Sequence, residues 1–211
     1  MNFILFRRKF ILPSLIILAV LIVVFALIAP ADKVLGDRVR LVYVHGGIIR
    51  VVLATFMLAA LLSLAYLIFN RSVLLDWARA LAQASLILWA VYFVISLITT
   101  IQTWGGIAWF EPRWIFTLQI SAIAPIAYLI GVVMKNARVS AVLNIALAGL
   151  ILWLEGRALL VLHPFDPIGL SGDAAIQSAY SVILILWALI GLQLVRGLRA
   201  FAVERAARNG S

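Results

Sequence analysis

The sequence predicts an all-α integral membrane protein with six transmembrane helices and both termini in the cytoplasm. Of its 211 residues 66% are hydrophobic and only 12% are charged, and the mean hydropathy is +1.18, which is far from the composition of a soluble domain. A spanning helix needs about 20 mostly apolar residues, and the chain contains six stretches of this kind. The lipid bilayer is therefore the first partner that the sequence predicts.

The first apolar stretch, 10–29, follows Arg-Arg-Lys and ends without a small-residue cleavage site, so we expect a retained helix rather than a removable signal. The fifth stretch, 139–154, is the shortest. If its helix continued through 158–162, Glu155 and Arg157 would lie inside that helix. No internal repeat or linker interrupts residues 1–211, which favours a single six-helix domain. The other expected spans are 48–69, 80–101, 115–134, 139–154 and 174–195.

The orientation follows from the basic residues near the ends of the spans, because Lys and Arg resist translocation. One side of the membrane would carry eleven basic and two acidic residues, and the other side six of each. Both termini are therefore expected inside, in a cytoplasmic (inner) membrane. The net charge of +9 then reflects topology, and no nucleic-acid partner is expected.

Three outer loops, at about 30–47, 102–114 and 155–173, hold nearly all the unusual residues, whereas the cytoplasmic connections are brief and suggest no site. The two histidines of the chain, His45 and His163, both fall in these loops. A neutral imidazole can ligate haem iron axially, and Gly46 and Gly47 after His45 would let another group approach the backbone. The alternative for each histidine is a hydrogen-bonded packing residue.

The second loop is rich in large aromatic side chains and contains two glycines. Aromatic residues at a bilayer interface are ordinary anchors, which accounts for one or two of them, while a cluster favours a flat platform on which a porphyrin stacks. Gly105 would let the ring lie close to the backbone. The aromatic members are Trp104, Trp109, Phe110 and Trp114.

Charged residues near these loops suggest partners for haem propionates, since a guanidinium binds a carboxylate in bidentate fashion. Arg50 lies a little over one turn beyond His45, at a depth where a charge must snorkel, pair or face a polar cavity. Arg113 and Arg157 compete for the same role. Glu111 and Arg113 flank a proline, and a simple ion pair between them is the alternative.

Several functions are excluded or disfavoured by missing motifs. The chain contains no cysteine, so it cannot attach haem covalently through C-x-x-C-H. It also lacks G-x-x-x-x-G-K-[ST], H-E-x-x-H and G-x-S-x-G, which gives no support to ATP hydrolysis, metalloprotease or serine-hydrolase chemistry. We therefore expect a binding protein and not an enzyme.

At these positions the sequence resembles the cytochrome c maturation protein C family, also called haem exporter protein C. Members have six spans, a first outer loop that ends in Tyr-x-His, a tryptophan-rich W-G-x5-D-x-R segment before the fourth helix, and Leu-His in the last outer loop. The corresponding elements here are APAD at 29–32, GDRVRLVYVH at 36–45, WGGIAWFEPR at 104–113 and LHP at 162–164.

The resemblance implies a protein that presents non-covalently bound haem b on the outer, periplasmic face of the membrane for transfer to a haem chaperone. It implies His45 and His163 as the axial iron ligands and Trp104, Gly105, Glu111 and Arg113 as parts of the platform. It also implies partners, namely an ATP-binding cassette ATPase and other membrane subunits. Two alternatives stay open: a permease subunit of an ATP-binding cassette transporter for another small solute, and a structural assembly subunit of a respiratory complex.

Overall fold

The computed structural model describes residues 8–158, 162, 168 and 171–209, and it confirms the predicted all-α architecture. Each of its six long helices contains a segment long and apolar enough to cross a membrane, so the chain has the fold of a multi-pass membrane protein. A short 3-10 helix, η2 (Arg8–Phe10), precedes them. The helices are α1 (Ile11–Ile28), α2 (Val39–Phe69), α3 (Ser72–Trp104), α4 (Pro112–Val133), α5 (Ala137–Arg157) and α6 (Ala174–Asn209).

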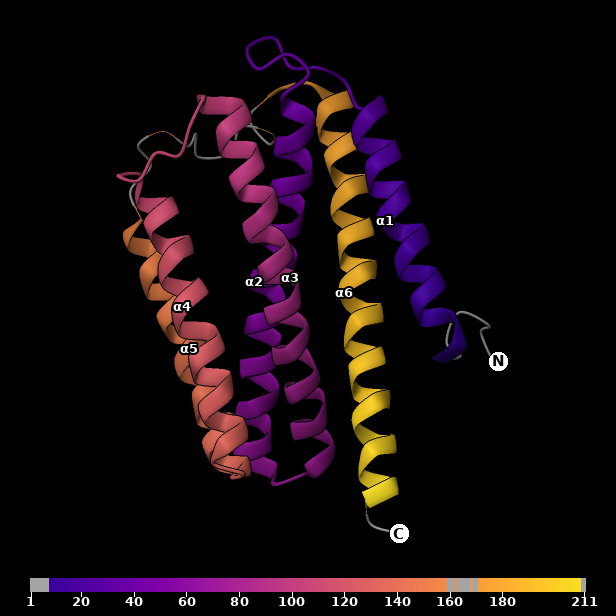
Figure 1. Ribbon diagram of the computed structural model, residues 1–211, viewed down its shortest axis with the longest axis vertical. Helices are drawn as coiled ribbons and strands as arrows, with labels where there is room; N and C mark the ends of the chain where they lie inside the picture. Colours follow the sequence, from indigo (N-terminus) through magenta and orange to yellow (C-terminus); the bar gives the residue numbers. More distant parts are fainter. Residues whose placement is uncertain (1–7, 159–161, 163–167, 169–170, 210–211) are drawn as a thin grey trace.

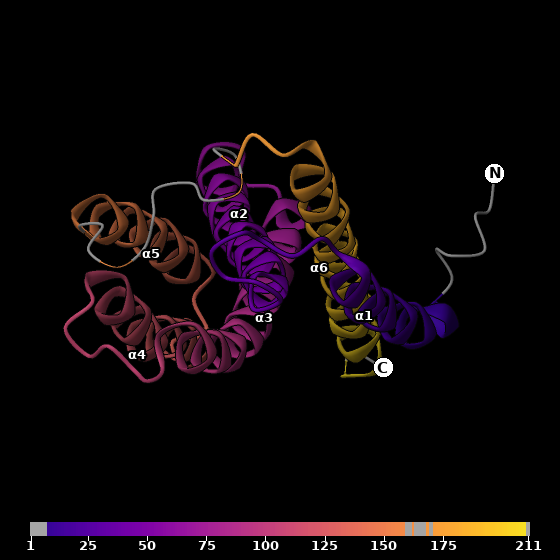
Figure 2. The ribbon, with the colours of Figure 1, turned by 90° about the horizontal axis from the view of Figure 1, so that it is seen from above.

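The helices form three groups arranged side by side (Figures 1 and 2). The antiparallel pair α2–α3 occupies the centre, and α6 packs against both of its members. On one flank α1 packs mainly against α6, and on the other flank α5 packs against α2 and α4 against α5. We call the end at which α2, α4 and α6 begin the cavity end, and the other the opposite end.

The two flanks do not stand level along the bundle axis. At the cavity end α2 and α3 rise beyond the first turn of α4 and the last turn of α5, and the connection 105–111 descends from α3 to α4 (Figure 1). The α4–α5 hairpin therefore forms a step beside the taller α2–α3 pair.

Local sequence sets the tight connections between these helices. Asn70 ends α2 in the left-handed conformation (φ 49°), with its N–H donating to the Tyr66 carbonyl, and Gly105 ends α3 in the same way at φ 77°. Pro112 occupies the first turn of α4, where its missing N–H has no helical partner to lose. The Asn136 side chain caps α5 by accepting from two backbone N–H groups.

The connection between α1 and α2 is held by the Asp32 carboxylate. Its Oδ1 accepts from the backbone N–H groups of Val34 at 2.8 Å and Leu35 at 2.9 Å. These hydrogen bonds, that of Leu35 first, lower the pKa of Asp32 below its ordinary value because they stabilise the charged form. Arg40 and Tyr43 of α2 donate to the carbonyls of Ala29 and Pro30, which fixes the connection onto α2.

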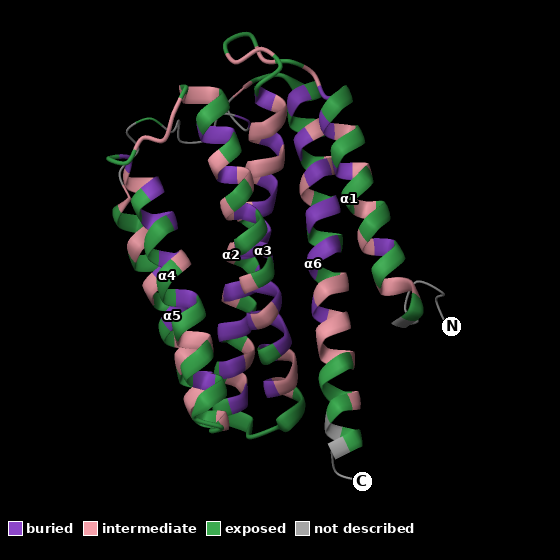
Figure 3. Ribbon diagram, in the orientation of Figure 1, coloured by how far each residue is buried: buried purple, intermediate pink, exposed green. Residues whose placement is uncertain are grey.

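The buried core lies where α2, α3 and α6 meet, and it extends to α4 and α5. Tyr43, Ile48, Ile120 and Ile183 are fully buried within it. Large apolar side chains on the outer flanks remain exposed, and Figure 3 marks the exposed residues in green. An exposed apolar surface of this extent is expected where lipid replaces water as the solvent.

The structure corrects the extents of the three predicted outer loops. The first connection covers only 29–38, because α2 begins at Val39, nine residues before the expected span. Residues 102–104 and 112–114 are helical, so the second connection is 105–111. Glu155 and Arg157 lie inside α5, as considered, and α5 ends at Arg157; the rest of the considered continuation falls largely on 159–161, outside the described residues.

Candidate ligand-binding cavity

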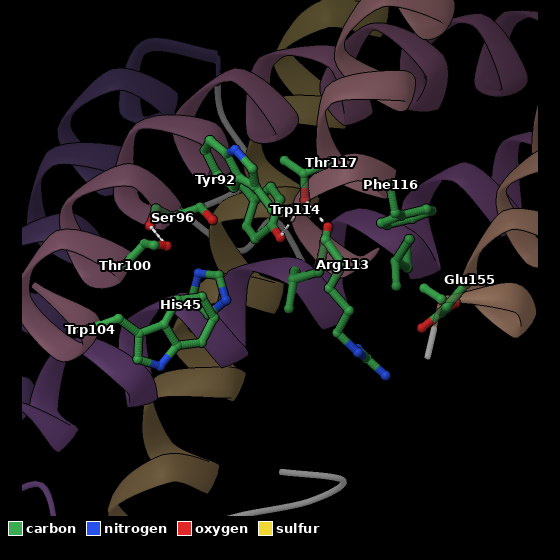
Figure 4. Close-up of a pocket in the computed structure, with 13 residues that line it drawn as sticks. His45, Tyr92, Ser96, Thr100, Trp104, Arg113, Trp114, Phe116, Thr117 and Glu155 are labelled. Atoms are coloured by element: carbon green, nitrogen blue, oxygen red, sulfur yellow. Dashed lines mark hydrogen bonds between the residues drawn. The ribbon is translucent and has the colours of Figure 1, made fainter. Parts of the chain in front are cut away.

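A cavity of about 70 Å³ opens on the step at the cavity end of the bundle, and residues of α2, α3, α4 and α5 line it (Figure 4). The helix α2 contributes His45, Ile49 and Leu53, which lie on one face because they are spaced by four residues. His45 sits in the second turn of α2, and its ring centroid lies 5.2 Å from that of Tyr92. The imidazole is therefore held against α3 at the wall of the cavity.

The wall formed by α3 is a polar stripe. Tyr92, Ser96, Thr100 and Trp104 repeat every four residues along α3 and all line the cavity. The Tyr92 hydroxyl lies 3.2 Å from Thr117 Oγ1 on α4, within hydrogen-bonding distance. Sequence reasoning missed this stripe, although polar residues at helical spacing inside an apolar span were a visible signal.

The first turns of α4 contribute Arg113 and Trp114, which the sequence predicted, together with Phe116 and Thr117. Trp114 is buried, with its indole stacked on Phe93 at a centroid distance of 5.7 Å and an angle of 19°. The Nε atom of Arg113 and the indole Nε1 of Trp114 are both buried and have no hydrogen-bond acceptor within the described part of the chain. Buried N–H donors of this kind usually have a partner, so this side of the cavity suits a ligand that carries an acceptor.

Glu155 at the end of α5 lines the cavity across from His45 and Trp104, with Arg113 between the two sides (Figure 4). Sequence reasoning weighed Glu155 only as a helix-end charge. The lining thus combines an imidazole, a guanidinium, a carboxylate and several hydroxyl groups among aromatic rings. Such a mixed lining can orient a ligand that has both a flat apolar part and an anionic part.

Glu111 lies outside the lining and has a structural contact. Its side chain is fully buried, and Oε2 accepts a hydrogen bond of 3.0 Å from the backbone N–H of Leu162. Since Glu111 directly precedes α4 and Leu162 lies between α5 and α6, this bond ties two distant connections together at the cavity end. The carboxylate therefore supports the step on which the cavity opens.

Other predicted site residues do not reach the cavity. Arg50 is exposed and stacks over the Tyr180 ring of α6 at 5.3 Å. Trp109 and Phe110 are 64% and 69% exposed, as interfacial anchors would be. Arg157 stacks over Trp153 at 4.7 Å. His163, the second predicted iron ligand, lies outside the described residues.

Two of the three glycines pack against a neighbouring helix. A Cβ at Gly46 would lie 3.4 Å from the Tyr180 ring, and one at Gly47 only 3.0 Å from Trp187 Cδ1, so both residues admit helix α6 rather than a ligand. Gly105 has open space at its Cβ position. It ends α3 with a positive φ, a conformation that favours glycine over other residues.

Among the described residues, no group of three or more histidine, cysteine or acidic side chains is placed to hold a metal ion. Comparison of the chain with protein-family models, with curated proteins and with solved structures finds no match. The resemblance to the cytochrome c maturation protein C family therefore stays a prediction from the motifs.

Proposed function

We propose that this protein binds haem at the cavity end and presents it for transfer to another protein. The observation that supports this proposal is that His45, Trp104, Arg113 and Trp114, which come from three different helices, line one cavity. A histidine, two indoles and an arginine match the three parts of haem, which are the iron, the flat ring and the propionates.

The lining residues fit haem in chemical type, and the volume of the cavity limits where haem is held. A buried water needs about 10–15 Å³ of such space, so a cavity of about 70 Å³ holds a few waters and cannot enclose a macrocycle. In this proposal haem is therefore held at the mouth of the cavity. His45 would supply an iron ligand, Arg113 and the Trp114 N–H would bind a propionate, and Trp104 would support the ring. Haem, when bound, contributes an iron that accepts neutral nitrogen ligands.

The proposal extends to delivery on the strength of the motif resemblance alone. In this extension His163 would be the second iron ligand, and the haem would pass to a haem chaperone with the help of an ATP-binding cassette ATPase and other membrane subunits. The cavity end would then face outward, and the basic opposite end would face the cytoplasm.

The test is an absorption spectrum of the detergent-purified protein expressed with ample haem. We expect a Soret band in the wild type that is lost in His45→Ala and in the His45→Ala, His163→Ala double variant. Arg113→Gln should weaken haem retention. Arg50→Gln is the matched control, because Arg50 is an arginine of the same end that lies outside the cavity.

Far-UV circular dichroism would show that each variant is folded. A wild type without a Soret band, or a His45→Ala variant that keeps it unchanged, would contradict haem binding at this site.

The small volume favours a second candidate function, a membrane subunit that binds a small organic anion for transport. The buried N–H donors of Arg113 Nε and Trp114 Nε1, which have no acceptor among the described residues, suit a carboxylate of that size. A thermal shift with small carboxylates that depends on Arg113 but not on His45 would favour this candidate over haem.

A further inference from the structure

Two hollows lie at the opposite end of the bundle, where the sequence suggested no site. One has a volume of about 340 Å³ and is lined by α3, α4, α5 and the end of α6; the other, of about 420 Å³, lies between α3 and α6. Both are lined by Arg79 and Gln83 of α3. The hollows therefore share the same turn of α3 in their linings.

The linings of both hollows carry an excess of positive charge. Lys135 and Arg205 join Arg79 at the first hollow, and Arg199 joins it at the second. Asp76 is the acidic residue among the described lining residues of the two hollows. Four cations around one carboxylate favour the binding of an anion.

The side chain of Arg199 is an independent indication that an anion binds at the second hollow. Its guanidinium lies over the Trp77 ring at 4.4 Å, which holds the side chain in place. Its Nε is buried and has no hydrogen-bond acceptor within the described part of the chain. A donor that is positioned but not satisfied is costly unless a ligand or water completes it.

Neutral polar groups beside the cations are already organised. Gln83 Nε2 donates to the Tyr128 hydroxyl at 2.6 Å, which joins α3 to α4 across the first hollow. Asn144 Nδ2 donates to Ser63 Oγ at 3.0 Å and joins α5 to α2 behind it. The neutral polar side chains of the first hollow are therefore fixed by hydrogen bonds between helices.

Part of each lining is apolar and continues onto exposed surface. Val132 lines the first hollow and is 52% exposed, and Val203 lines the second and is 51% exposed. Both belong to helices that contain a span long and apolar enough to cross a membrane. A ligand with an anionic head and apolar chains satisfies both the cations and this apolar surface.

We propose that the two hollows bind the phosphate headgroup of an anionic phospholipid from the adjacent leaflet, with Arg79 at the centre. Phosphate accepts several charge-assisted hydrogen bonds from guanidinium groups, and basic pockets between spanning helices bind anionic headgroups by this chemistry. The acyl chains lie along the exposed apolar walls. This site is separate from the cavity at the other end and does not depend on haem binding.

The experiment measures binding of phosphatidylglycerol, with phosphatidylcholine as the zwitterionic comparison, to the purified full-length chain in detergent by native mass spectrometry. Arg79 and Arg205 are both exposed, so the Arg79→Gln, Arg205→Gln double variant leaves no buried hole. We expect it to bind phosphatidylglycerol at least about 30-fold more weakly, because it removes two guanidinium groups that donate charge-assisted hydrogen bonds to the phosphate.

Arg138→Gln is the matched control, because Arg138 is an exposed cation of the same end that lines neither hollow. We expect less than about a twofold change for it, with glycerol phosphate competing poorly. Equal weakening in Arg138→Gln, or equal binding of phosphatidylcholine, would show a diffuse surface charge and overturn the site. Competition by glycerol phosphate as strong as that by the lipid would overturn the lipid assignment in favour of a soluble phosphate. The melting temperature of each variant reports its folding.

Discussion

The contact of α2 with α6 at Gly47 is predicted to be tight for any side chain larger than hydrogen. An added Cβ would lie 3.0 Å from Cδ1 of the buried Trp187 and 3.4 Å from Ile183 Cγ2. Overpacking of a core by one methyl group costs about 1–3 kcal/mol when the neighbours cannot move. Gly47→Ala also gains about 1 kcal/mol of helix propensity, so its net effect ranges from about zero to about 2 kcal/mol of destabilisation.

A matched substitution separates the two effects. Gly149 lies in α5 with open space at its Cβ position, so Gly149→Ala gains the same propensity without a clash. The difference between the two variants is then the overpacking cost alone, about 1–3 kcal/mol. Gly191→Ala, whose Cβ would lie 3.2 Å from Val51 Cγ1, should show a smaller cost at the same interface.

The assay is equilibrium unfolding in mixed micelles, followed by far-UV circular dichroism, with each variant compared with the wild type. We expect Gly149→Ala to be the most stable of the three and Gly47→Ala the least. A Gly47→Ala variant as stable as Gly149→Ala would refute the close approach of α2 and α6 at this point.

Three further predictions concern polar contacts. Glu111→Ala leaves the Leu162 N–H without its acceptor and should lower the free energy of unfolding by about 1–3 kcal/mol. Glu111→Gln keeps an acceptor and should lower it less. Unfolding midpoints in detergent would measure both variants. Because hydrogen bonds lower the pKa of Asp32 below 3.8, its stabilisation is present above that pH and is lost as the pH falls through the lowered pKa. The wild type should therefore melt above Asp32→Asn at neutral pH, with a difference that vanishes in acid, and a pH-independent difference would contradict this. Ser63→Ala and Asn144→Ala, which remove a hydrogen bond between α2 and α5, should show a coupling of about 0.6 kcal/mol in a double-mutant cycle, and a coupling of zero would exclude the bond.

The six spans were predictable because a run of about 20 apolar residues is a local signal. The start of α2 was not, since the expected span began only at 48, after the glycines at 46–47. Their contact with Tyr180 and Trp187 of α6 is what makes them compatible with a helix, and that contact joins residues more than 130 positions apart.

The candidate site was predictable in part for a similar reason. His45, Trp104, Arg113 and Trp114 stood out by type near the ends of spans, and the structure brings them to one cavity. Arg50 also stood out, but five residues along a helix rotate a side chain by about 140° from His45, which directs it to α6 instead.

The polar stripe of α3 and the carboxylate of Glu155 complete the cavity only through the packing of four helices. A linear sequence does not show this packing, so the composition of the lining had to come from the structure.

The difference in height between the two flanks affects the angle at which the molecule sits in its bilayer. The 18 residues of α1 measure about 27 Å, close to the thickness of a hydrocarbon core of about 30 Å. Figure 1 places α1 nearer the cavity end and the α4–α5 hairpin nearer the opposite end. The apolar bands of the two flanks are thus offset along the long axis, and a flat slab perpendicular to that axis does not cover both. We expect the bundle to stand oblique, with the α4–α5 flank raised, which brings the mouth of the cavity closer to the aqueous boundary.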